Sequence, residues 1–377
     1  MEAMITQIQQ ECDIKYCWES VVQDANCSPF VSWMWIGPWL SEITSKENAP
    51  FLVKIIDQNE IVAIGLLHMA SVVRHGIFKR KILFLNELPL NGDNMVIEYN
   101  GLAVKEGYEE KAWCCLFAKL HEFPQWDEFH INAISRTTSV RVRKALVHSS
   151  SFLSFKSEKK ESIFYADLGE FASWSDVELS VFSKNKRAQI NRSIRAYQSK
   201  YGGNLICEKA PTVDKAMAFF DKMGALHTIY WNSKGSVGAF ANDKWVQFNK
   251  SIIERSLESG LVEMYRISIN DFDIGYVYNF VWRDIAFNIQ SGFTYHQDNK
   301  FKPGYVCHYL IMKSLFEFGV KKYNFLFGST HYKKSLSNTS DSLEWLVVRK
   351  RADYLKFLIE DQSLEFMRKI KKLLKAK

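Results

Sequence analysis

Motifs that define several large enzyme classes are absent from this chain of 377 residues. The sequence has no GxxxxGK followed by Ser or Thr, no GxSxG and no GxGxxG. Assignment as a P-loop NTPase, a serine hydrolase or a Rossmann enzyme therefore loses its main support. Histidines do not form an i, i+4 pair accompanied by a glutamate, so we expect no zinc site and no bound metal.

Paired cysteines and long apolar runs are also missing. The seven cysteines form no CxxC motif, and the adjacent Cys114 and Cys115 lie in an apolar helical segment. We expect reduced core thiols rather than a disulfide framework. No apolar run reaches 18 residues, and the N-terminus lacks a basic start followed by an apolar core. The sequence thus predicts no membrane span and no secretory signal, and a location in the cytoplasm or peripheral to the inner membrane.

Apolar side chains and clustered positive charge are plentiful. The apolar fraction is 47% and the aromatic fraction 14%, enough for large cores in two or three domains. The net charge is +7, and residues 183–200 and 368–377 each carry six Lys or Arg. Such clusters favour an anionic partner, namely a phosphorylated cofactor, an acyl carrier protein, tRNA or an anionic lipid surface. The alternative is that each cluster is a solvated helix face.

Two parts of the chain share one order of elements. Each has a hairpin with an acidic, amide-rich turn, followed by a strand, a helix and a strand. We infer a duplicated α/β domain, against the alternative of chance similarity between two α/β units. The predicted elements are 51–56, 61–67, 81–85, 110–123 and 128–133, and then 261–269, 274–282, 286–293, 305–318 and 323–327.

The predicted domains are 1–169, 170–350 and a basic C-terminal helix at 351–377. Residues 140–182 join the first two, and the polar residues 149–151 and 156–161 within them could form a turn or a hairpin edge. A basic helix over 183–200 opens the second domain, and Thr212 caps the next helix, which runs to about residue 227. The C-terminal helix interleaves charged and apolar residues and could touch anionic lipid.

The stretch from 286 to 334 reads strand, loop, helix, strand and basic loop. Pro303 and Gly304 stand just ahead of the apolar helical run. The unpaired amides at a helix N-terminus favour an anion, so a phosphate-bearing ligand could lie where this helix begins. The alternative is a plain β-α-β packing unit.

These parts, in this order, resemble the GNAT acyltransferase superfamily over residues 180–349 and, more faintly, over 18–135. The likeness is closest to the two-domain CelD-like proteins of cellulose and exopolysaccharide loci, with FemAB-type peptidyltransferases as more distant relatives. The matching positions are Arg187 and Arg192 in the basic helix, His227 and Trp231, Ser291-Gly292-Phe293, Pro303-Gly304, Tyr323 to Gly328, and Tyr332-Lys333.

Three positions depart from the family pattern. Tyr230 and Phe327 replace arginines, and Asn324 replaces an aspartate. These changes put the family's chemistry in doubt, because either the substrate differs or catalysis is weak.

The resemblance implies two tandem GNAT-like domains, each a mixed, mostly antiparallel sheet flanked by helices. It implies an acyl-CoA or an acyl carrier protein thioester between two splayed strands, direct attack by an amine or amino sugar, and no metal. The candidate catalytic residues are His227, Asn324, Tyr332 and Lys333. The candidate donor-binding residues are Gln290, Ser291, Gly292, Phe293, Lys302, Pro303, Gly304 and Tyr305. The candidate acceptor-binding residues are Arg187, Arg192, Trp231, Asn279 and Glu98.

Several of these residues have a second interpretation. His227 is either a base or a helix-end histidine satisfied by the backbone, and Trp231 is either a pocket wall or core. Asn279 and Asn324 are buried strand amides that need partners, from a structural network or from substrate. The first domain has Glu106 where a phosphate would lie, so we expect it to bind no cofactor of its own.

Three functions remain open from the sequence. The first is N-acyl transfer from a CoA or carrier-protein thioester to an amine. The second is FemAB-like transfer from aminoacyl-tRNA, the only nucleic acid partner that we consider. The third is a non-catalytic binding module.

Overall fold

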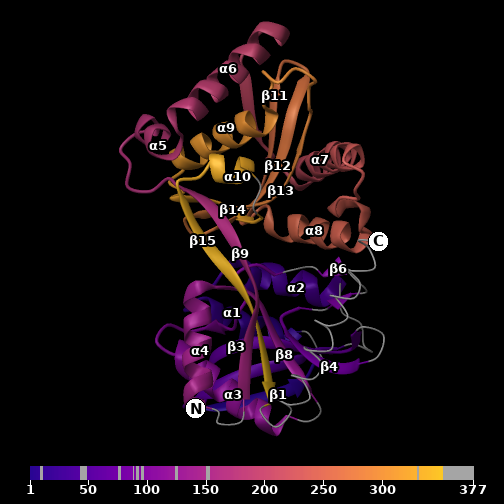
Figure 1. Cartoon of the computed structure of the whole chain (residues 1–377), viewed down its shortest axis with the longest axis vertical. Coiled ribbons are helices and arrows are strands. Elements are labelled where there is room, and N and C mark those ends of the chain that lie inside the picture. Colours follow the sequence, from indigo (N-terminus) through magenta and orange to yellow (C-terminus); the bar gives the residue numbers. More distant parts are fainter. Residues whose placement is uncertain are drawn as a thin grey trace, which may run out of the picture. The chain divides into compact units, whose positions relative to one another are not determined.

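A computed structural model describes residues 1–8, 12–42, 49–74, 78–87, 89–90, 93–94, 97–123, 126–149, 153–328 and 331–350. The predicted C-terminal helix at 351–377 lies outside these residues. The chain forms two compact units (Figure 1). Unit 1 comprises Met1–Cys27, Ser45–Lys160 and Glu344–Lys377, and unit 2 comprises Ser28–Thr44 and Glu161–Leu343.

Unit 1 is built on the strand order β1-β2-β3-β4-β8-β15, with the short β7 against β3. Helices α3 and α4 supply apolar side chains such as Trp113, Phe117 and Leu146 to one core. Its elements are β1 Glu2–Gln7, α1 Cys12–Val22, β2 Phe51–Asp57, β3 Glu60–Arg74, β4 Phe78–Leu85, β5 Pro89–Leu90, β6 Asp93–Asn94, β7 Ala103–Val104, α3 Glu109–Glu122, β8 Glu128–Ser135 and α4 Arg136–Ser149. Strands β9 Leu153–Asp167 and β15 Thr339–Lys350 have residues in both units.

Unit 2 has the strand order β9-β14-β13-β12-β11-β10. Helices α5, α6 and α9 lie on one side of its sheet, and α7 and α8 on the other (Figure 1). Its elements are η1 Pro29–Val31, α2 Trp33–Glu42, α5 Trp174–Val181, α6 Lys184–Tyr201, β10 Leu205–Lys209, α7 Val213–Ser233, η3 Ala239–Ala241, α8 Asp243–Ser256, β11 Val262–Ile269, β12 Phe272–Trp282, β13 Ile285–Phe293, α9 Pro303–Glu317, β14 Lys322–Phe327 and α10 His331–Ser335.

The hairpin predicted near residue 57 is confirmed. Gln58 and Asn59 have φ values of 47° and 68°. Two positive φ angles are what a two-residue type I′ turn requires, and the pair of strands is fixed in register by Asp57 opposite Glu60. Val53 and Ile55 alternate into the core, as the sequence pattern predicts.

The aromatic segment from Ser28 to Thr44 belongs to unit 2, although it lies early in the chain. The Trp35 ring lies 4.7 Å from the Phe248 ring of α8, and Phe30 lies 5.8 Å from Phe280 of β12. Burial of these large rings stabilises the placement of α2, because aromatic side chains remove much apolar area from water. A division of the chain into contiguous domains does not anticipate this segment.

Strands β13 and β14 run parallel but share only three rungs. The paired residues are Ile285 with Lys322, Ala286 with Tyr323, and Phe287 with Asn324. Beyond Phe287, β13 continues to Phe293 without a partner rung from β14, so the two strands separate. A bulge interrupts the pairing of β12 with β13. Asn288 lies opposite Asn279 and Gln290 opposite Tyr278, so Ile289 is an extra residue without a partner on β12.

Unit 1 repeats this arrangement. Strands β4 and β8 also run parallel over three rungs, from Ile82 opposite Glu128 to Phe84 opposite His130, with helix α3 between them in the chain. Each unit therefore carries a mixed, mostly antiparallel sheet flanked by helices, and the predicted fold class is confirmed.

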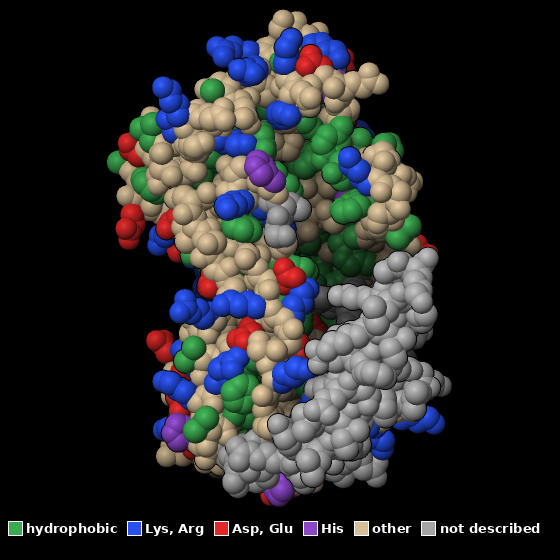
Figure 2. Space-filling model, viewed as in Figure 1, with side chains coloured by type: hydrophobic (Ala, Val, Ile, Leu, Met, Phe, Trp, Pro, Cys, Tyr) green, Lys and Arg blue, Asp and Glu red, His purple; other side chains and the backbone are tan. Residues whose placement is uncertain are grey.

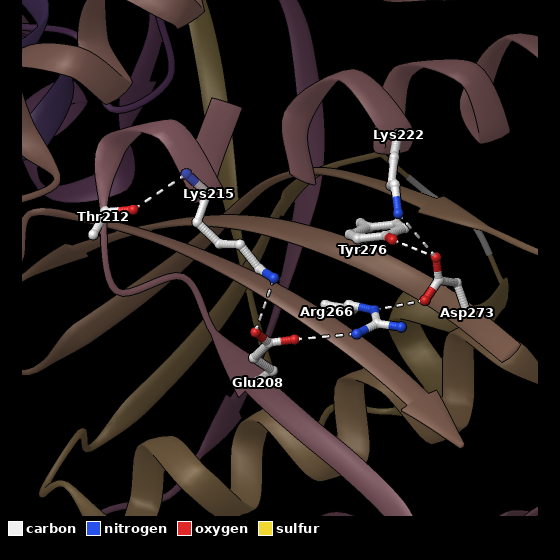
Figure 3. A network of polar contacts seen from close by, with 7 residues as sticks. All are labelled: Glu208, Thr212, Lys215, Lys222, Arg266, Asp273 and Tyr276. Carbon is white, nitrogen blue, oxygen red and sulfur yellow. Dashed lines mark hydrogen bonds and ion pairs between the residues drawn. The ribbon is translucent and has the colours of Figure 1, made fainter. Parts of the chain in front are cut away.

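A polar network fixes helix α7 on the sheet of unit 2 (Figure 3). Thr212 caps the helix by accepting a hydrogen bond from the Lys215 amide at 3.3 Å, as predicted. The contacts of the network are Lys215 with Glu208 at 3.4 Å, Glu208 with Arg266 at 3.3 Å, Arg266 with Asp273 at 2.6 Å, and Asp273 with Lys222 at 3.6 Å and Tyr276 at 2.5 Å. These links from β10, β11 and β12 hold the helix that carries His227 and Trp231.

Candidate functional site

Helix α9 begins at the predicted Pro-Gly pair. Pro303 is its first residue, and the Lys302 amide just before it donates to the Ser193 hydroxyl of α6 at 2.9 Å. The amides of Gly304 and Tyr305 lie in the first turn, where no intrahelical carbonyl can accept from them. This helix end therefore offers two backbone donors to an anion.

Gly304 is a glycine for reasons of space. Its φ is not in the positive range, but a Cβ at this position would lie 3.3 Å from the Phe293 ring. Phe293 ends β13, so the first turn of α9 packs closely against the end of that strand. The structure thus brings together the end of β13 and the start of α9, as predicted for the donor site.

Positive charge lies beside this helix end. The Lys186 Nζ of α6 lies 3.6 Å from the centre of the Tyr305 ring, and the Lys186 side chain is buried. Burial alone raises the pKa of a tyrosine, but hydrogen bonds from Lys186 and Ser335 outweigh it and lower the pKa of Tyr305. The sequence pattern did not single out Lys186, which is a member of the basic cluster at 183–200.

The two arginines of the basic helix are not brought together. Arg187 donates to the backbone carbonyls of Phe182 and Glu178, at the end of α5. Arg192 is exposed to solvent. Arg187 therefore secures the junction of α5 and α6, and its predicted contact with substrate stays a prediction.

A buried polar network lies at the paired end of β13 and β14. The Asn279 Oδ1 accepts from the Asn288 Nδ2 at 3.2 Å and from the Tyr323 hydroxyl at 3.3 Å. The same hydroxyl lies 2.9 Å from the His308 Nδ1. Asn279 therefore has the structural network that was one of its two predicted roles. His308 was missed, and its sequence signal is its spacing of four residues from Gly304, which puts both on one face of α9.

Helix α10 carries Tyr332 and Lys333. The Tyr332 ring lies nearly parallel to the His308 ring, with centroids 5.9 Å apart. Burial, with a smaller contribution from Tyr230, raises the pKa of Tyr332 to about 12, so its hydroxyl remains a proton donor at neutral pH. Lys333 Nζ donates to the Phe327 carbonyl at 2.7 Å, at the end of β14.

His227 is buried on α7 beside aromatic rings. Its ring centroid lies 5.2 Å from that of Phe240 and 5.9 Å from that of Trp231, and Gly238 leaves room for it. Burial lowers the pKa of His227 to about 4, so it is neutral at physiological pH. The sequence suggested that His227 is a base with a pKa near neutrality. Its apolar surroundings lower the pKa, so His227 is a weaker base than the sequence suggested.

Asn324 and Gln290 bond to the backbone of their own strands. The Asn324 Oδ1 accepts from the Leu326 amide at 2.8 Å, where Leu326 has a φ of 60° and the pairing of β14 with β9 is irregular. The Gln290 Oε1 accepts from the Ser291 amide at 3.0 Å. Gly292 is required because a Cβ there would strike the backbone of Met223 on α7.

The one candidate outside unit 2 is Glu98, which is buried in unit 1. Its predicted role in acceptor binding stays a prediction. In unit 2, Figure 2 shows a hollow between the regions of α10 and α7, and hydrophobic side chains gather inside it.

One segment of unit 2 is similar to a known protein family. Residues 184–334 match the family model described as an acetyltransferase (GNAT) domain. This segment begins with α6, ends within α10 and includes the separated strands and the start of α9. No curated protein matches the sequence.

Solved structures share the fold of about nine-tenths of the chain at low identity. FemX is 11% identical with a TM-score of 0.59, covering 91% of this chain and 97% of its own. L-PGS from Bacillus licheniformis is 10% identical with a TM-score of 0.52, covering 92% and 95%. The C-terminal domain of a putative lysylphosphatidylglycerol synthetase from Agrobacterium fabrum is 12% identical with a TM-score of 0.52, covering 93% and 96%.

These matches support the GNAT acyltransferase fold and a general likeness to FemX and L-PGS. The CelD-like branch stays a prediction. Among the described residues, no helix is long and apolar enough to cross a membrane, and no group of three His, Cys, Asp or Glu side chains could hold a metal.

The buried histidines predict acid sensitivity. Burial, and then the charge of Lys333, lower the pKa of His308 to about 3, from 6.5 in the unfolded chain. The unfolded chain therefore binds a proton below pH 6.5 that the folded protein does not bind, so stability falls as the pH decreases toward 3. From pH 7 to pH 5, His308 should cost the wild type about 2 kcal/mol of unfolding free energy.

His308→Phe, which fits among aromatic neighbours, should remove that part of the pH dependence. Urea unfolding of both proteins at pH 7 and pH 5 measures it. An equal loss of stability in the two proteins would show that His308 is not held neutral.

Proposed function

We propose that unit 2 transfers an acyl group from a pantetheine thioester, carried by CoA or by an acyl carrier protein, to an amine. The observation that carries this proposal is the separation of β13 and β14 after three rungs, with the start of α9 beside the end of β13. Its support is the match of this segment to a GNAT domain.

The residues of this chain would act mainly by positioning and electrostatics. The amides of Gly304 and Tyr305 would bind the donor's pyrophosphate, with Lys302 nearby, and the room at Gly304 admits it. The acyl arm would lie between the separated strands, along Ser291 to Phe293. Attack by the amine on the thioester carbonyl forms the amide bond and breaks the carbon–sulfur bond.

Tyr332 is suited to protonate the departing thiolate, because its raised pKa keeps the hydroxyl protonated, and the tyrosinate that forms takes up the proton released by the attacking nitrogen. His227 and Trp231 would form part of the acceptor's wall on α7. His227 Nδ1 has no hydrogen-bond partner among the described residues, and the pKa of the ring is low, so we expect the amine to enter largely neutral. Asn324 and Lys333 would shape the end of β14 through their backbone contacts.

Calorimetric titration with acetyl-CoA and with acylated carrier protein tests the donor. A mass-spectrometric screen of amines, amino sugars included, then tests the acceptor. We expect binding of at least one donor and acylation of at least one amine. Binding of neither donor would overturn the proposal.

A second candidate is FemAB-like transfer from aminoacyl-tRNA. Two observations favour it: the fold shared with FemX and L-PGS over nine-tenths of the chain, and the basic helix α6. The long coiled-coil arm that often marks FemAB-like proteins is not evident in the described part of unit 2. Transfer of a labelled amino acid from charged tRNA to a cell-wall precursor, without turnover of acyl-CoA, would favour this candidate.

A further inference from the structure

The buried network in unit 2 allows a consistent assignment of its hydrogen-bond directions. The Asn279 Oδ1 can only accept, and it lies within reach of the Asn288 amide and the Tyr323 hydroxyl. Tyr323 has one proton, and we assign it to the contact with Asn279, so that the Tyr323 oxygen accepts from His308 Nδ1, which lies 2.9 Å away. This assignment puts the proton of the neutral imidazole on Nδ1.

The other imidazole nitrogen is then a bare lone pair. His308 is fully buried, and its Nε2 has no hydrogen-bond partner in the part of the chain that the structure describes. A buried polar atom without a partner is costly, and such atoms in native proteins call for an explanation. The low pKa of His308, caused by burial and then by Lys333, keeps this nitrogen unprotonated at physiological pH.

The imidazole contacts side chains of both strands beyond the point where the strands separate. Its ring centroid lies 5.7 Å from that of Phe293, the last residue of β13, and 5.2 Å from that of Phe325 in β14. Both residues lie beyond the last shared rung, whereas Tyr323 lies within the paired part. Because Nδ1 is bonded to Tyr323, Nε2 is directed away from the paired end.

The position along α9 matches the course of an extended donor. His308 is one turn beyond Gly304 on the same helix face, and the Phe293 ring contacts both. The Tyr332 ring stacks nearly parallel to the imidazole. An arm that runs from the start of α9 toward Tyr332 therefore passes His308.

We propose that His308 Nε2 binds the pantetheine arm of the acyl donor by accepting a hydrogen bond from one of its amide N–H groups. The inference rests on the proposed function. A bare nitrogen needs a donor, and the two secondary amides are the N–H donors between the phosphate and the thioester. His308 is fully buried, so the arm reaches Nε2 only when side chains around the imidazole move.

Two substitutions separate this contact from the link to Tyr323. His308→Asn keeps an amide near the Nδ1 position and loses the acceptor at Nε2, whereas His308→Gln places an amide oxygen near Nε2. Calorimetry measures the binding of CoA and of phosphopantetheinylated carrier protein, the second source of the arm. The His308→Asn variant should bind each about tenfold more weakly than wild type. The His308→Gln variant should regain most of the lost affinity, and both variants should melt close to the wild-type temperature. Equal affinity of wild type and the Asn variant would overturn this inference alone.

Two further measurements use the wild-type protein alone. Wild type should bind a pantetheine analogue with N-methylated amides about tenfold more weakly than pantetheine itself. Nitrogen chemical shifts of the wild-type imidazole should show the Nδ1–H tautomer, and the Nε2–H tautomer would overturn the assignment. If wild type binds neither CoA nor the carrier protein, the proposed function fails and this inference fails with it.

Discussion

A glutamate in place of Gly304 should abolish binding of acetyl-CoA and leave the protein folded. The amides at the start of α9 lie next to this position. Even a Cβ atom added at Gly304 would lie only 3.3 Å from the Phe293 ring. A longer side chain fills the approach to those amides, and a carboxylate repels the phosphates beside it. Acidic residues near a helix N-terminus stabilise the helix, so the melting temperature should fall little.

Three comparison variants assign the effect. Gly304→Gln adds nearly the same bulk without charge and should weaken binding less than Gly304→Glu. Gly304→Ala should have a mild effect, because φ is not positive and only the Phe293 ring must shift. Val213→Glu puts the same charge at the first residue of α7 and should leave donor affinity unchanged. Titration calorimetry and thermal unfolding measure all four. Unchanged acetyl-CoA affinity in the glutamate variant would place the donor elsewhere.

Local sequence signals predicted the elements that carry this site. The helix after Pro303 and the cap at Thr212 are both present, because turn residues and caps act through nearby backbone groups. The strand from 286 to 293 and the strand from 323 to 327 were also found from their patterns. Their separation after three rungs depends on the bulge near Asn288 and on pairing with distant strands, so the residues alone did not reveal it.

Long-range packing decided the features that sequence patterns missed. Residues 136–149 form helix α4, which the sequence patterns did not predict; residues from 140 on were assigned only to the segment that joins the two domains. Its β-branched and polar residues favour helix weakly, but Val142, Ala145 and Leu146 are buried in the core with α3. His308 was hidden in an apolar run, because its role depends on a tyrosine of another strand.

Replacing Arg349 by methionine should destabilise unit 1 strongly. Arg349 lies on β15, and its Nε and Nη2 donate to the Glu128 Oε1 of β8 at 3.0 and 2.8 Å. Glu128 is fully buried, and its other oxygen lies 2.9 Å from His130 Nε2. Removing the guanidinium takes its two contacts from a buried carboxylate, and breaking such a buried pair costs about 3–5 kcal/mol of unfolding free energy.

The double variant Glu128→Leu/Arg349→Met should regain most of that loss, because it removes both charges and keeps apolar volume at the site. Lys350→Met is the matched control. The Lys350 ammonium lies 4.9 Å from the centre of the Trp126 ring, and Lys350 is less buried than Arg349. Its loss should therefore cost less than about 1 kcal/mol of unfolding free energy, the value of a cation–π contact at an exposed site. Urea unfolding monitored by far-UV circular dichroism compares the four proteins. A stability of Arg349→Met within about 1 kcal/mol of wild type would show that the pair contributes little, in which case the carboxylate has another source of charge compensation.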